Sequence, residues 1–510
     1  MDAGRTMAGM TRAVVVAGGG PSGLAAAAEL ALHGIDCVVI EPRIDISHTR
    51  PRAKTTNVRT MEHLRRWGAA EALRAAAPLP VAWSQRVTFC HSLAGPRVTD
   101  FDGAFGLTVG RDDRFAEAGQ QVPQPVIEQV LRDHVDKQPS VELRLGHRVT
   151  GLRRRANAVT VYAVDDTGSP YELEARYLLG CDGAWSVVRE RIGVQYTGRS
   201  DSRPNFNVVF RAPTLDTSLG PAVQYWAVGG KHPGVIGRLD LAGTWWAIFP
   251  GVDPAYGEGH AAELIADIVG GPVEHELLAS DPWTARMLVA ERFRDGRVFL
   301  VGESAHLNPP WGGHGYNTCV GDAVNIAWKI AAVEQGWAGS DLLASYEPER
   351  RAVVEQTVAT AESNMRHLAG DLAADPDAIQ EAKRAEFHSL GLVLGYTYAG
   401  SPVIQQTAGE VKAGDVSTYL PSDQPGSRLP HAWLADGSSL YDRLGKGFTL
   451  IGPRHSEDLA ERARRLGMPL QVLQQEREDF LLVRPDQHIA WRADDPAEID
   501  LALTIGRTDR

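Results

Sequence analysis

The chain has 510 residues, of which 43% are hydrophobic and 23% are charged, and its net charge is −12. These values are typical of a soluble globular protein of two or three domains, and an acidic chain without a stripe of lysine and arginine argues against a nucleic-acid partner. The sequence shows no signal-peptide pattern and no run of about 18 apolar residues, so neither export nor a membrane span is expected. The four cysteines are too far apart for a zinc site or a redox pair, and they indicate a cytoplasmic protein with reduced thiols and no bound metal. They are Cys37, Cys90, Cys181 and Cys319.

The first predicted unit is a βαβ motif around the sequence GGGPSG. Its parts are an apolar strand at 13–17, a helix at 24–32 and a second strand at 38–40. Gly18, Gly20 and Gly23 fit the GxGxxG pattern, in which the glycines allow a tight turn, close approach of a pyrophosphate and close helix–strand packing. The helix N-terminus favours phosphate, and Glu41 at the end of the second strand can accept hydrogen bonds from ribose hydroxyls. This pattern predicts dinucleotide binding, disfavours a 2′-phosphate and leaves FAD and NAD open.

Two later segments repeat the pattern of an apolar strand that ends in a glycine and an acid. The first ends at Asp182-Gly183, with a helix beginning near Ser186, and the second ends at Gly302-Glu303. A carboxylate in such a position can bind a polyol hydroxyl, which FAD has in its ribityl chain and NAD lacks. These segments therefore favour FAD.

In combination these motifs resemble the flavoprotein aromatic hydroxylases of the para-hydroxybenzoate hydroxylase fold, in the subgroup of phenol and polyketide hydroxylases. The similarity covers nearly the whole chain. It includes Pro51-Arg52-Ala53, residues 57–62, Gln124 with Glu128 and Leu131, and the blocks 309–318, 322–329 and 345–351. Two positions depart from the family pattern, because the distal acid is usually Asp rather than Glu303, and His314 stands where many relatives have Gln or an apolar residue.

The resemblance implies an α/β fold with three parts. They are a Rossmann-like FAD-binding domain (1–190 and 291–395), an inserted β-sheet domain for the substrate (191–290) and a thioredoxin-like C-terminal domain (396–510). Arg52 and Gln124 are expected at the FAD phosphates or ribityl chain, and Asp182 at the turn near the cofactor or the groove where a nicotinamide docks. The full set of expected cofactor residues is Gly18, Gly20, Pro21, Ser22, Gly23, Glu41, Arg43, Arg52, Gln124, Asp182, Gly302, Glu303, Pro309, Gly312, Gly313, Gly315, Tyr316 and Asn317.

A loop rich in glycine and proline, from Pro309 to Asn317, precedes a helix expected at 318–335. The apolar positions of this helix are spaced for one buried face. We expect the helix start to face the N1–C2=O edge of the flavin ring, where reduced flavin is anionic and the positive end of the helix dipole stabilises it. With only one GxGxxG unit in the chain, NADH or NADPH is expected to dock transiently.

The region 204–290 predicts a set of strands that covers the flavin and forms the substrate pocket. Tyr225, Trp226, Arg238 and Trp246 are candidates to face the substrate, and His314 and Tyr225 are candidates for a general base. The expected reaction uses NAD(P)H and O2 to hydroxylate a phenolic or polycyclic aromatic ring through a flavin C4a-hydroperoxide. Baeyer–Villiger or decarboxylative chemistry on the same scaffold, an NAD-dependent dehydrogenase and a non-catalytic dinucleotide-binding module remain alternatives.

The last hundred residues predict a separate domain after a loop at 421–430. A strand at 448–451, a helix at 457–466, a short run at 470–473 and a hairpin around Arg484-Pro485-Asp486-Gln487 resemble the thioredoxin-like domain of phenol hydroxylases. No cysteine lies in this part, so dithiol chemistry is excluded. Its expected role is structural or in the association of two copies as a homodimer.

Overall fold

The computed structural model describes residues 12–48, 53–406 and 414–507. Its first sheet has the strand order β16-β17-β10-β1-β2-β7, and β9 and β8 extend it from β10. The strands are β1 (Arg12–Ala17), β2 (Cys37–Glu41), β7 (Val141–Leu145), β8 (Arg148–Arg154), β9 (Val159–Val164), β10 (Pro170–Gly180), β16 (Arg294–Asp295) and β17 (Val298–Leu300). The five strands β17, β10, β1, β2 and β7 are parallel. Their near-continuous apolar sequences, such as Val14-Val15-Val16, suit a sheet that is buried on both faces.

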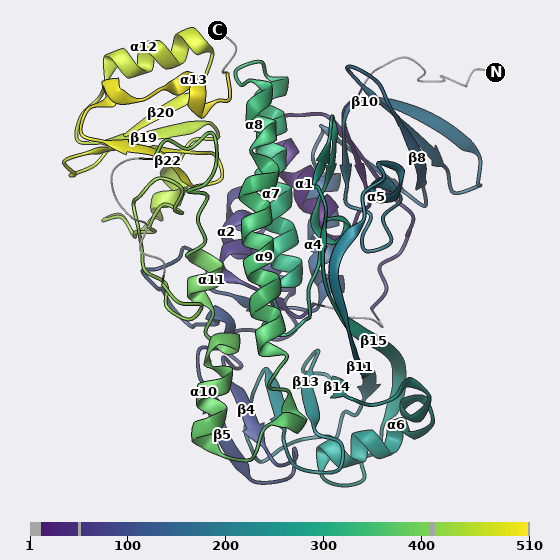
Figure 1. Ribbon diagram of the computed structural model, residues 1–510. Coiled ribbons are helices and arrows are strands. Elements are labelled where there is room, and N and C mark those ends of the chain that lie inside the picture. Colours follow the sequence, from purple (N-terminus) through teal and green to yellow (C-terminus); the bar gives the residue numbers. More distant parts are fainter. Residues whose placement is uncertain (1–11, 49–52, 407–413, 508–510) are drawn as a thin grey trace.

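The helices of the first domain lie between the strands of this sheet or follow its last strand in the chain. They are α1 (Pro21–Leu32), α2 (Val58–Trp67), α3 (Ala70–Ala76), α4 (Gln124–Asp136), α5 (Val187–Arg191), α7 (Gly315–Glu334), α8 (Ser340–Ala344) and α9 (Tyr346–Asn364). Helix α1 packs against both α7 and α4, and α7 and α9 run side by side along the middle of the molecule (Figure 1). The predicted βαβ unit is confirmed, and α7 begins three residues before its expected start.

A second sheet has the order β18-β15-β11-β14-β13-β12-β4-β5. Its strands are β4 (Val87–Cys90), β5 (Arg97–Phe101), β11 (Tyr196–Arg211), β12 (Gln224–Ala227), β13 (Gly234–Arg238), β14 (Thr244–Pro250), β15 (Glu276–Ala290) and β18 (His306–Leu307). The long strands β11 and β15 reach from the first domain into this sheet (Figure 1). The sequence suggested the range 191–290 for the substrate domain, and strands β4 and β5 lie before that range. They nevertheless belong to the second sheet, because β4 pairs with β12.

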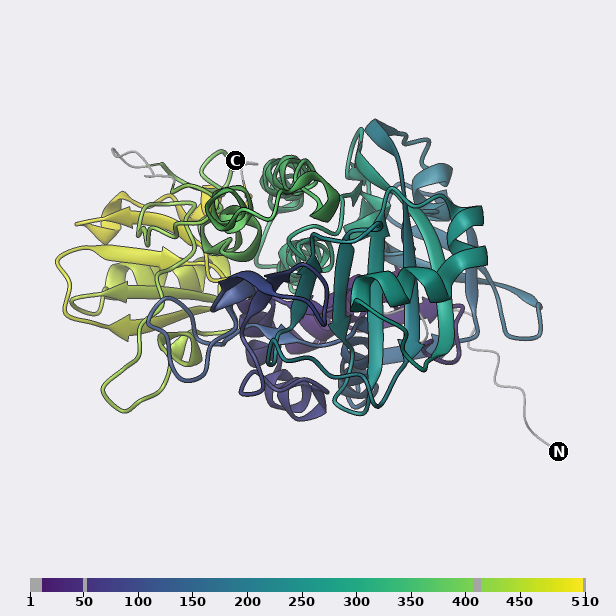
Figure 2. The same ribbon diagram turned by 90° about the horizontal axis from the view of Figure 1, so that it is seen from below.

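The two faces of the second sheet have different neighbours. Helix α6 (Pro254–Val269) packs with Phe206, Tyr225 and Trp245 in one buried cluster. Helix α10 (Pro376–Phe387) packs against strand β5, and α11 (Leu390–Leu394) leads the chain back toward α2 (Figures 1 and 2). Short elements complete the two main domains. They are β3 (Thr55–Thr56), β6 (Gln120–Gln121), η1 (Ala104–Gly106), η2 (Gly302–Ser304) and η3 (Ala369–Asp371).

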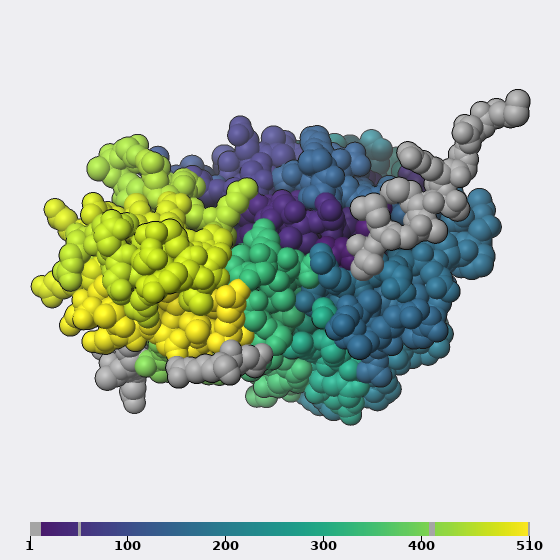
Figure 3. Space-filling view, turned by 90° about the horizontal axis from the view of Figure 1, so that it is seen from above, coloured from purple at the N-terminus to yellow at the C-terminus, as the bar shows by residue number. Residues whose placement is uncertain are grey.

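The C-terminal domain is a four-stranded sheet of order β20-β19-β21-β22. Its elements are η4 (Leu440–Arg443), β19 (Phe448–Gly452), α12 (Glu457–Leu466), β20 (Leu470–Gln474), β21 (Phe480–Val483), β22 (Ile489–Ala493), η5 (Pro496–Glu498) and α13 (Leu501–Thr504). Strands β19 and β20 are parallel and the other two pairs are antiparallel, which is the arrangement of the thioredoxin fold. This block lies at one end of the molecule, beside the central helices (Figure 3). The three-part α/β fold expected from the sequence is confirmed.

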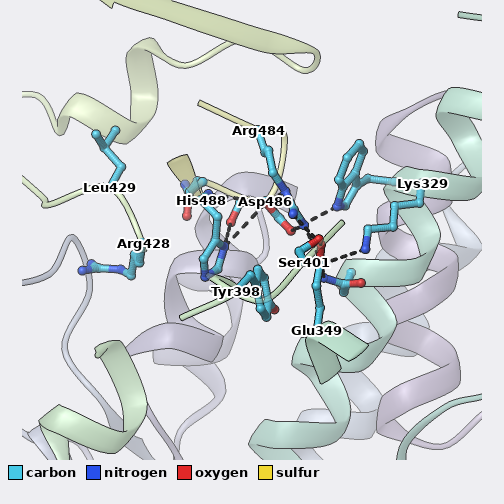
Figure 4. Close-up of polar contacts among 12 residues, drawn as sticks. Lys329, Glu349, Tyr398, Ser401, Arg428, Leu429, Arg484, Asp486 and His488 are labelled. Carbon is cyan, nitrogen blue, oxygen red and sulfur yellow. Dashed lines mark hydrogen bonds and ion pairs between the residues drawn. The ribbon is translucent and has the colours of Figure 1, made fainter. Parts of the chain in front are cut away.

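Buried charges join the C-terminal domain to the central helices (Figure 4). Arg484 donates to both carboxylate oxygens of Glu349, at 2.8 and 2.9 Å, and Lys329 Nζ lies 2.7 Å from the same carboxylate. Arg484 also pairs with Asp486, which accepts a hydrogen bond from the Trp328 indole. Burial alone would raise the pKa of Glu349, but Arg484 and Lys329 hold it well below its usual range.

No helix in the described ranges is long and apolar enough to cross a bilayer.

Candidate active site

One cavity of about 730 Å³ connects the turn after β1 with the second sheet. At one end it is lined by the first βαβ unit, in the middle by the acids that follow β10 and β17, and at the other end by aromatic side chains. Thirteen of the residues expected to bind the cofactor line it. They are Gly18, Gly20, Pro21, Ser22, Glu41, Arg43, Gln124, Asp182, Glu303, Gly312, Gly313, Gly315 and Tyr316.

The three glycines of the first turn have three different surroundings. Gly18 has φ +102°, and a Cβ there would lie 2.4 Å from the carbonyl oxygen of Cys181. A Cβ on Gly23 would lie 1.9 Å from the carbonyl oxygen of Gly18, so this glycine serves helix–strand packing and does not line the cavity. At Gly20 the nearest atom to a Cβ would be 4.0 Å away, at the tip of Arg43. Gly20 therefore leaves its backbone open to the cavity, as close approach of a pyrophosphate requires.

A chain of polar side chains borders the same end of the cavity. Arg43 Nε lies 2.6 Å from Glu41 Oε1, and its Nη2 lies 3.1 Å from Glu128. Gln124 donates to Glu128 at 2.7 Å. The structure therefore brings Glu41, Arg43 and Gln124 together at this end of the cavity. Arg52, the remaining expected residue here, lies outside the described residues.

The two acids that follow the strands differ in what they contact. Asp182 accepts hydrogen bonds from Ser186 Oγ at 2.5 Å and from the Val188 amide at 3.0 Å, so its carboxylate caps α5. Burial raises the pKa of Asp182, although these hydrogen bonds oppose the shift. Glu303 also lines the cavity, and no ion pair joins its carboxylate to any other described residue. Glu303 is therefore the acid available to bind a polyol hydroxyl.

The glycine-rich loop and the start of α7 form the middle wall of the cavity. Gly312 and Gly313 have φ values of +98° and +70°. Asn317 does not line the cavity. Its Nδ2 instead donates to the carbonyl oxygens of Gly313 and Thr55, at 2.7 and 3.0 Å. It braces the loop against β3. Gly302 and Pro309, which were also expected at the cofactor, shape the backbone next to the cavity without lining it.

The second sheet presents alternate residues to the cavity. Trp226 on β12 and Trp246 on β14 line it, together with Val235 and Ile248. The neighbouring residue Tyr225 points to the α6 side, where its hydroxyl donates to the carbonyl of Gly220 at 2.6 Å and accepts from the amide of Ala222 at 3.0 Å. Of the four substrate-facing candidates, the structure therefore brings only Trp226 and Trp246 to the cavity. Arg238 lies with its guanidinium 4.2 Å from the Trp245 ring centre on the same face as Tyr225.

Neither candidate for the general base lines this cavity. Tyr225 lies on the opposite face of the sheet. The ring of His314 lies behind Gly312, because a Cβ on Gly312 would be 2.6 Å from His314 Nε2. Burial lowers the pKa of His314 to about 4. This placement supports a structural role for His314, in which its ring packs beneath the glycine-rich loop and does not contact the substrate.

The sequence did not single out several residues at the aromatic end, among them three with polar or aromatic side chains. Lys54, Trp311 and Glu386 all line the cavity. Lys54 directly follows the Pro-Arg-Ala motif, which was a usable signal. Trp311 lies inside the glycine-rich block, whereas Glu386 on α10 belongs to no motif. In the described part of the chain, no group of three or more His, Cys, Asp or Glu residues could hold a metal ion.

Comparisons with known proteins agree with this geometry. Residues 11–361 match a family model described as "FAD binding domain", and residues 422–507 match one described as "Aromatic-ring hydroxylase, C-terminal". Aklavinone 12-hydroxylase RdmE of Streptomyces purpurascens is 31% identical, over 96% of this chain and 97% of its own. The 2,4-dichlorophenol 6-monooxygenase of Delftia acidovorans is 29% identical, over 94% of each chain. The crystal structure of the flavin-dependent monooxygenase PieE in complex with FAD and substrate matches with a TM-score of 0.87 at 28% identity, over 97% of this chain and 98% of that one.

The fold and the family match define a flavoprotein, and one cavity is lined by Gly20, by Glu303 and by the start of α7. More specifically, the chain belongs to the FAD-dependent aromatic-ring hydroxylases. It is an FAD-dependent aromatic monooxygenase, and NAD(P)H is the reductant typical of its family. The dehydrogenase and the non-catalytic module are not favoured, and neither is Baeyer–Villiger or decarboxylative chemistry.

Proposed function

We propose that this monooxygenase hydroxylates a phenolic or polycyclic aromatic ring that binds against Trp226 and Trp246. The observation that carries the proposal is the single cavity of about 730 Å³, which is polar at its nucleotide end and aromatic at the other. Cavities with mostly apolar walls and a few placed polar groups are typical of small-molecule sites. The overall balance is one aromatic C–H, O2, NAD(P)H and a proton giving one aromatic C–OH, water and NAD(P)⁺.

FAD, when bound, accepts the hydride of the nicotinamide and activates O2. Gly20 and the N-terminus of α1 would hold the pyrophosphate, and Glu303 would accept hydrogen bonds from the ribityl hydroxyls. Gly312, Gly313 and Gly315 would lie along the flavin ring, with the start of α7 supplying partial positive charge. These assignments follow from which residues line the cavity and which of them keep free polar groups.

The aromatic walls have two tasks at the reacting end. The indole rings of Trp226, Trp246 and Trp311 exclude water, and they offer flat surfaces against which an aromatic substrate can stack. Exclusion of water strengthens the electrostatic interactions in the site and prevents side reactions. The sheet would thereby hold one carbon of the ring in a reactive orientation.

We also infer that the protein works in the cytoplasm. All four cysteines are free thiols and all are buried, which suits a reducing compartment in which NAD(P)H is available.

The test begins with the purified protein, reconstituted with FAD and examined for the visible bands of bound flavin. NAD(P)H consumption is then measured with a panel that includes 2,4-dichlorophenol and hydroxylated anthraquinones, and the products are analysed by mass spectrometry. We expect at least one compound to stimulate NAD(P)H consumption and to gain one oxygen atom. A protein that binds no flavin after reconstitution contradicts the proposal, and so does a product that has gained oxygen by ring expansion or lost CO2.

A further inference from the structure

Lys54 is held firmly at the aromatic end of the cavity. It precedes β3, which pairs with β6, and the carbonyl of Thr55 accepts a hydrogen bond from Asn317. The side chain lines the cavity, and its ammonium lies 4.1 Å from the centre of the Trp246 ring. The position of this charge is therefore set by the same brace that holds the glycine-rich loop.

The charge of Lys54 has no carboxylate partner in the described part of the chain. The side chain is half-buried, its ammonium faces the Trp246 ring, and desolvation lowers its pKa to about 8. Two fully buried lysines provide the comparison. Lys329 lies 2.7 Å from Glu349, and Lys383 lies 2.6 Å from Glu386. Desolvation of an ammonium without a counter-charge is unfavourable, so a half-buried one that faces a cavity indicates a ligand that supplies the negative charge when it fills that cavity.

The remaining charges around this end do not supply that counter-charge. Glu386 lines the cavity, but its carboxylate is paired with Lys383, whose ammonium lies 4.1 Å from the Trp226 ring centre. Glu303 and Asp182 line the middle of the cavity, where Asp182 caps α5. Among the described residues, the aromatic end therefore has the positive charge of Lys54 next to flat indole walls, with no carboxylate paired to it.

We propose that Lys54 binds the ionised hydroxyl oxygen of the aromatic substrate, so that the enzyme selects phenols and holds them as phenolates. This inference rests on the proposed hydroxylase function. The hydroxyl proton passes to water on binding, and no covalent bond forms with the chain. A phenolate ring is richer in electrons than the neutral phenol, so it is the better partner for an electrophilic oxygen atom. Lys54 would thus set both the substrate class and the orientation of the ring.

The experiment uses the FAD-loaded enzyme and two pairs of probes, each a phenol with its methyl ether: 4-nitrophenol with 4-nitroanisole, and alizarin with its dimethyl ether. The phenols change colour on ionisation, so the absorption spectrum reports the protonation state of the bound ligand. The variants are K54M, which keeps the length of the side chain, and K54R, which keeps the charge. K231M is the matched control, because Lys231 is an exposed lysine of the substrate sheet that does not line the cavity.

We expect wild type to lower the pKa of a bound phenol and K54M to lose about 10- to 100-fold in affinity for the phenols, as for a hydrogen bond to a charged group. Affinity for the ethers should be unchanged in K54M, and K54R and K231M should behave like wild type toward both. An equal loss for phenols and ethers overturns the proposal. The proposal is also overturned if K54M changes the reduction potential of the flavin but leaves the ratio of phenol affinity to ether affinity unchanged. Lys54 would then act on the cofactor.

Failure of this inference can be told apart from failure of the proposed function. If wild type binds FAD and hydroxylates rings without an ionisable hydroxyl while binding none of the phenols, the role of Lys54 is wrong and the monooxygenase function stands. If the protein binds no flavin, the proposed function itself fails.

Discussion

At the scale of single residues, Glu303 stands where the family pattern usually has an aspartate. Its carboxylate lines the cavity and has no ion-pair partner among the described residues, whereas both oxygens of Asp182 are used to cap α5. We expect E303Q to weaken FAD binding about 10- to 100-fold, because a hydrogen bond to a charged group contributes roughly 1.5–3 kcal/mol. Titration of the apoprotein with FAD, followed by flavin fluorescence, measures this change.

Two further variants make the Glu303 test specific. E303D keeps the charge and should retain most of the affinity, whereas E190Q removes a carboxylate from the exposed surface of α5 and should change nothing. If E303Q binds FAD as tightly as wild type, Glu303 is not the ribityl ligand.

His314 predicts how stability depends on pH. Burial lowers its pKa to about 4, whereas a histidine in an unfolded chain titrates at about 6.5. Between these values the unfolded chain binds a proton that the folded chain does not, so the stability is complete above pH 6.5 and is lost as the pH falls. We expect H314Q to remove this dependence, so that from pH 7 to pH 5 wild type loses about 2 kcal/mol more than the variant.

Urea denaturation at a series of pH values measures the effect of H314Q. The substitution removes Nε2, which has no hydrogen-bond partner in the described part of the chain, so activity should survive. H455Q, at an exposed histidine of the C-terminal domain, is the control and should follow wild type. Parallel pH curves for wild type and H314Q would contradict the assignment, and a loss of turnover in H314Q alone would restore His314 as a candidate base.

At the scale of elements, the loop before α7 depends on backbone shapes that glycine adopts readily. Gly312 has φ +98°, and a Cβ there would lie 2.6 Å from the ring of His314. G312A should therefore cost about 1–2 kcal/mol for the left-handed backbone and should also displace the cavity wall. G34A is a matched control, because Gly34 has φ +71° with no atom within 4 Å of a Cβ.

Both glycine variants should unfold at a lower temperature than wild type, but only G312A should bind FAD more weakly. Thermal unfolding and FAD titration of the two proteins separate these effects. Equal FAD affinity in G312A and G34A would show that the loop does not shape the flavin site.

The elements themselves were largely predictable, because their signals are local. The run Ala13–Ala17, the glycines that follow it and the helix at 457–466 have the periods and end residues of the observed structures. Local signals could not predict which side chains of the second sheet point into the cavity. Tyr225 and Trp226 are both large aromatic residues, and only the packing of α6 decides which of them is turned from the cavity.

Contacts between distant segments were equally hidden in the sequence. Strand β4 joins the second sheet by pairing with β12, more than a hundred residues later in the chain. The free charge of Lys54 became visible only once the partners of the fully buried lysines were known. Local patterns predict elements, whereas the charge balance of a cavity depends on every segment that borders it.

At the scale of the whole molecule, the C-terminal domain is attached through buried charge rather than through apolar surface alone. Arg484 pairs with Glu349 of α9 and with Asp486 of its own hairpin, and all three side chains are almost fully buried (Figure 4). The hairpin therefore depends on a partner that lies 135 residues earlier in the chain. Such a pair is weak evidence for high stability, but breaking it leaves an uncompensated buried charge.

We expect R484M to lower the free energy of unfolding by about 3–5 kcal/mol, because Glu349 keeps only Lys329 as a charged partner, beside its hydrogen bonds from Asn325 and Ser401, and Asp486 loses its arginine. R464M on α12 is the matched control, since Arg464 is mostly exposed and pairs with an exposed Glu461, and it should change stability by less than about 1 kcal/mol. Urea denaturation measures both, and proteolysis shows whether the C-terminal domain separates first.

If R484M is as stable as R464M, the buried charges do not attach the domain. If R484M releases the domain while the rest of the chain still binds FAD, the cofactor site does not need the C-terminal domain to stay folded, and that domain serves stability or association instead.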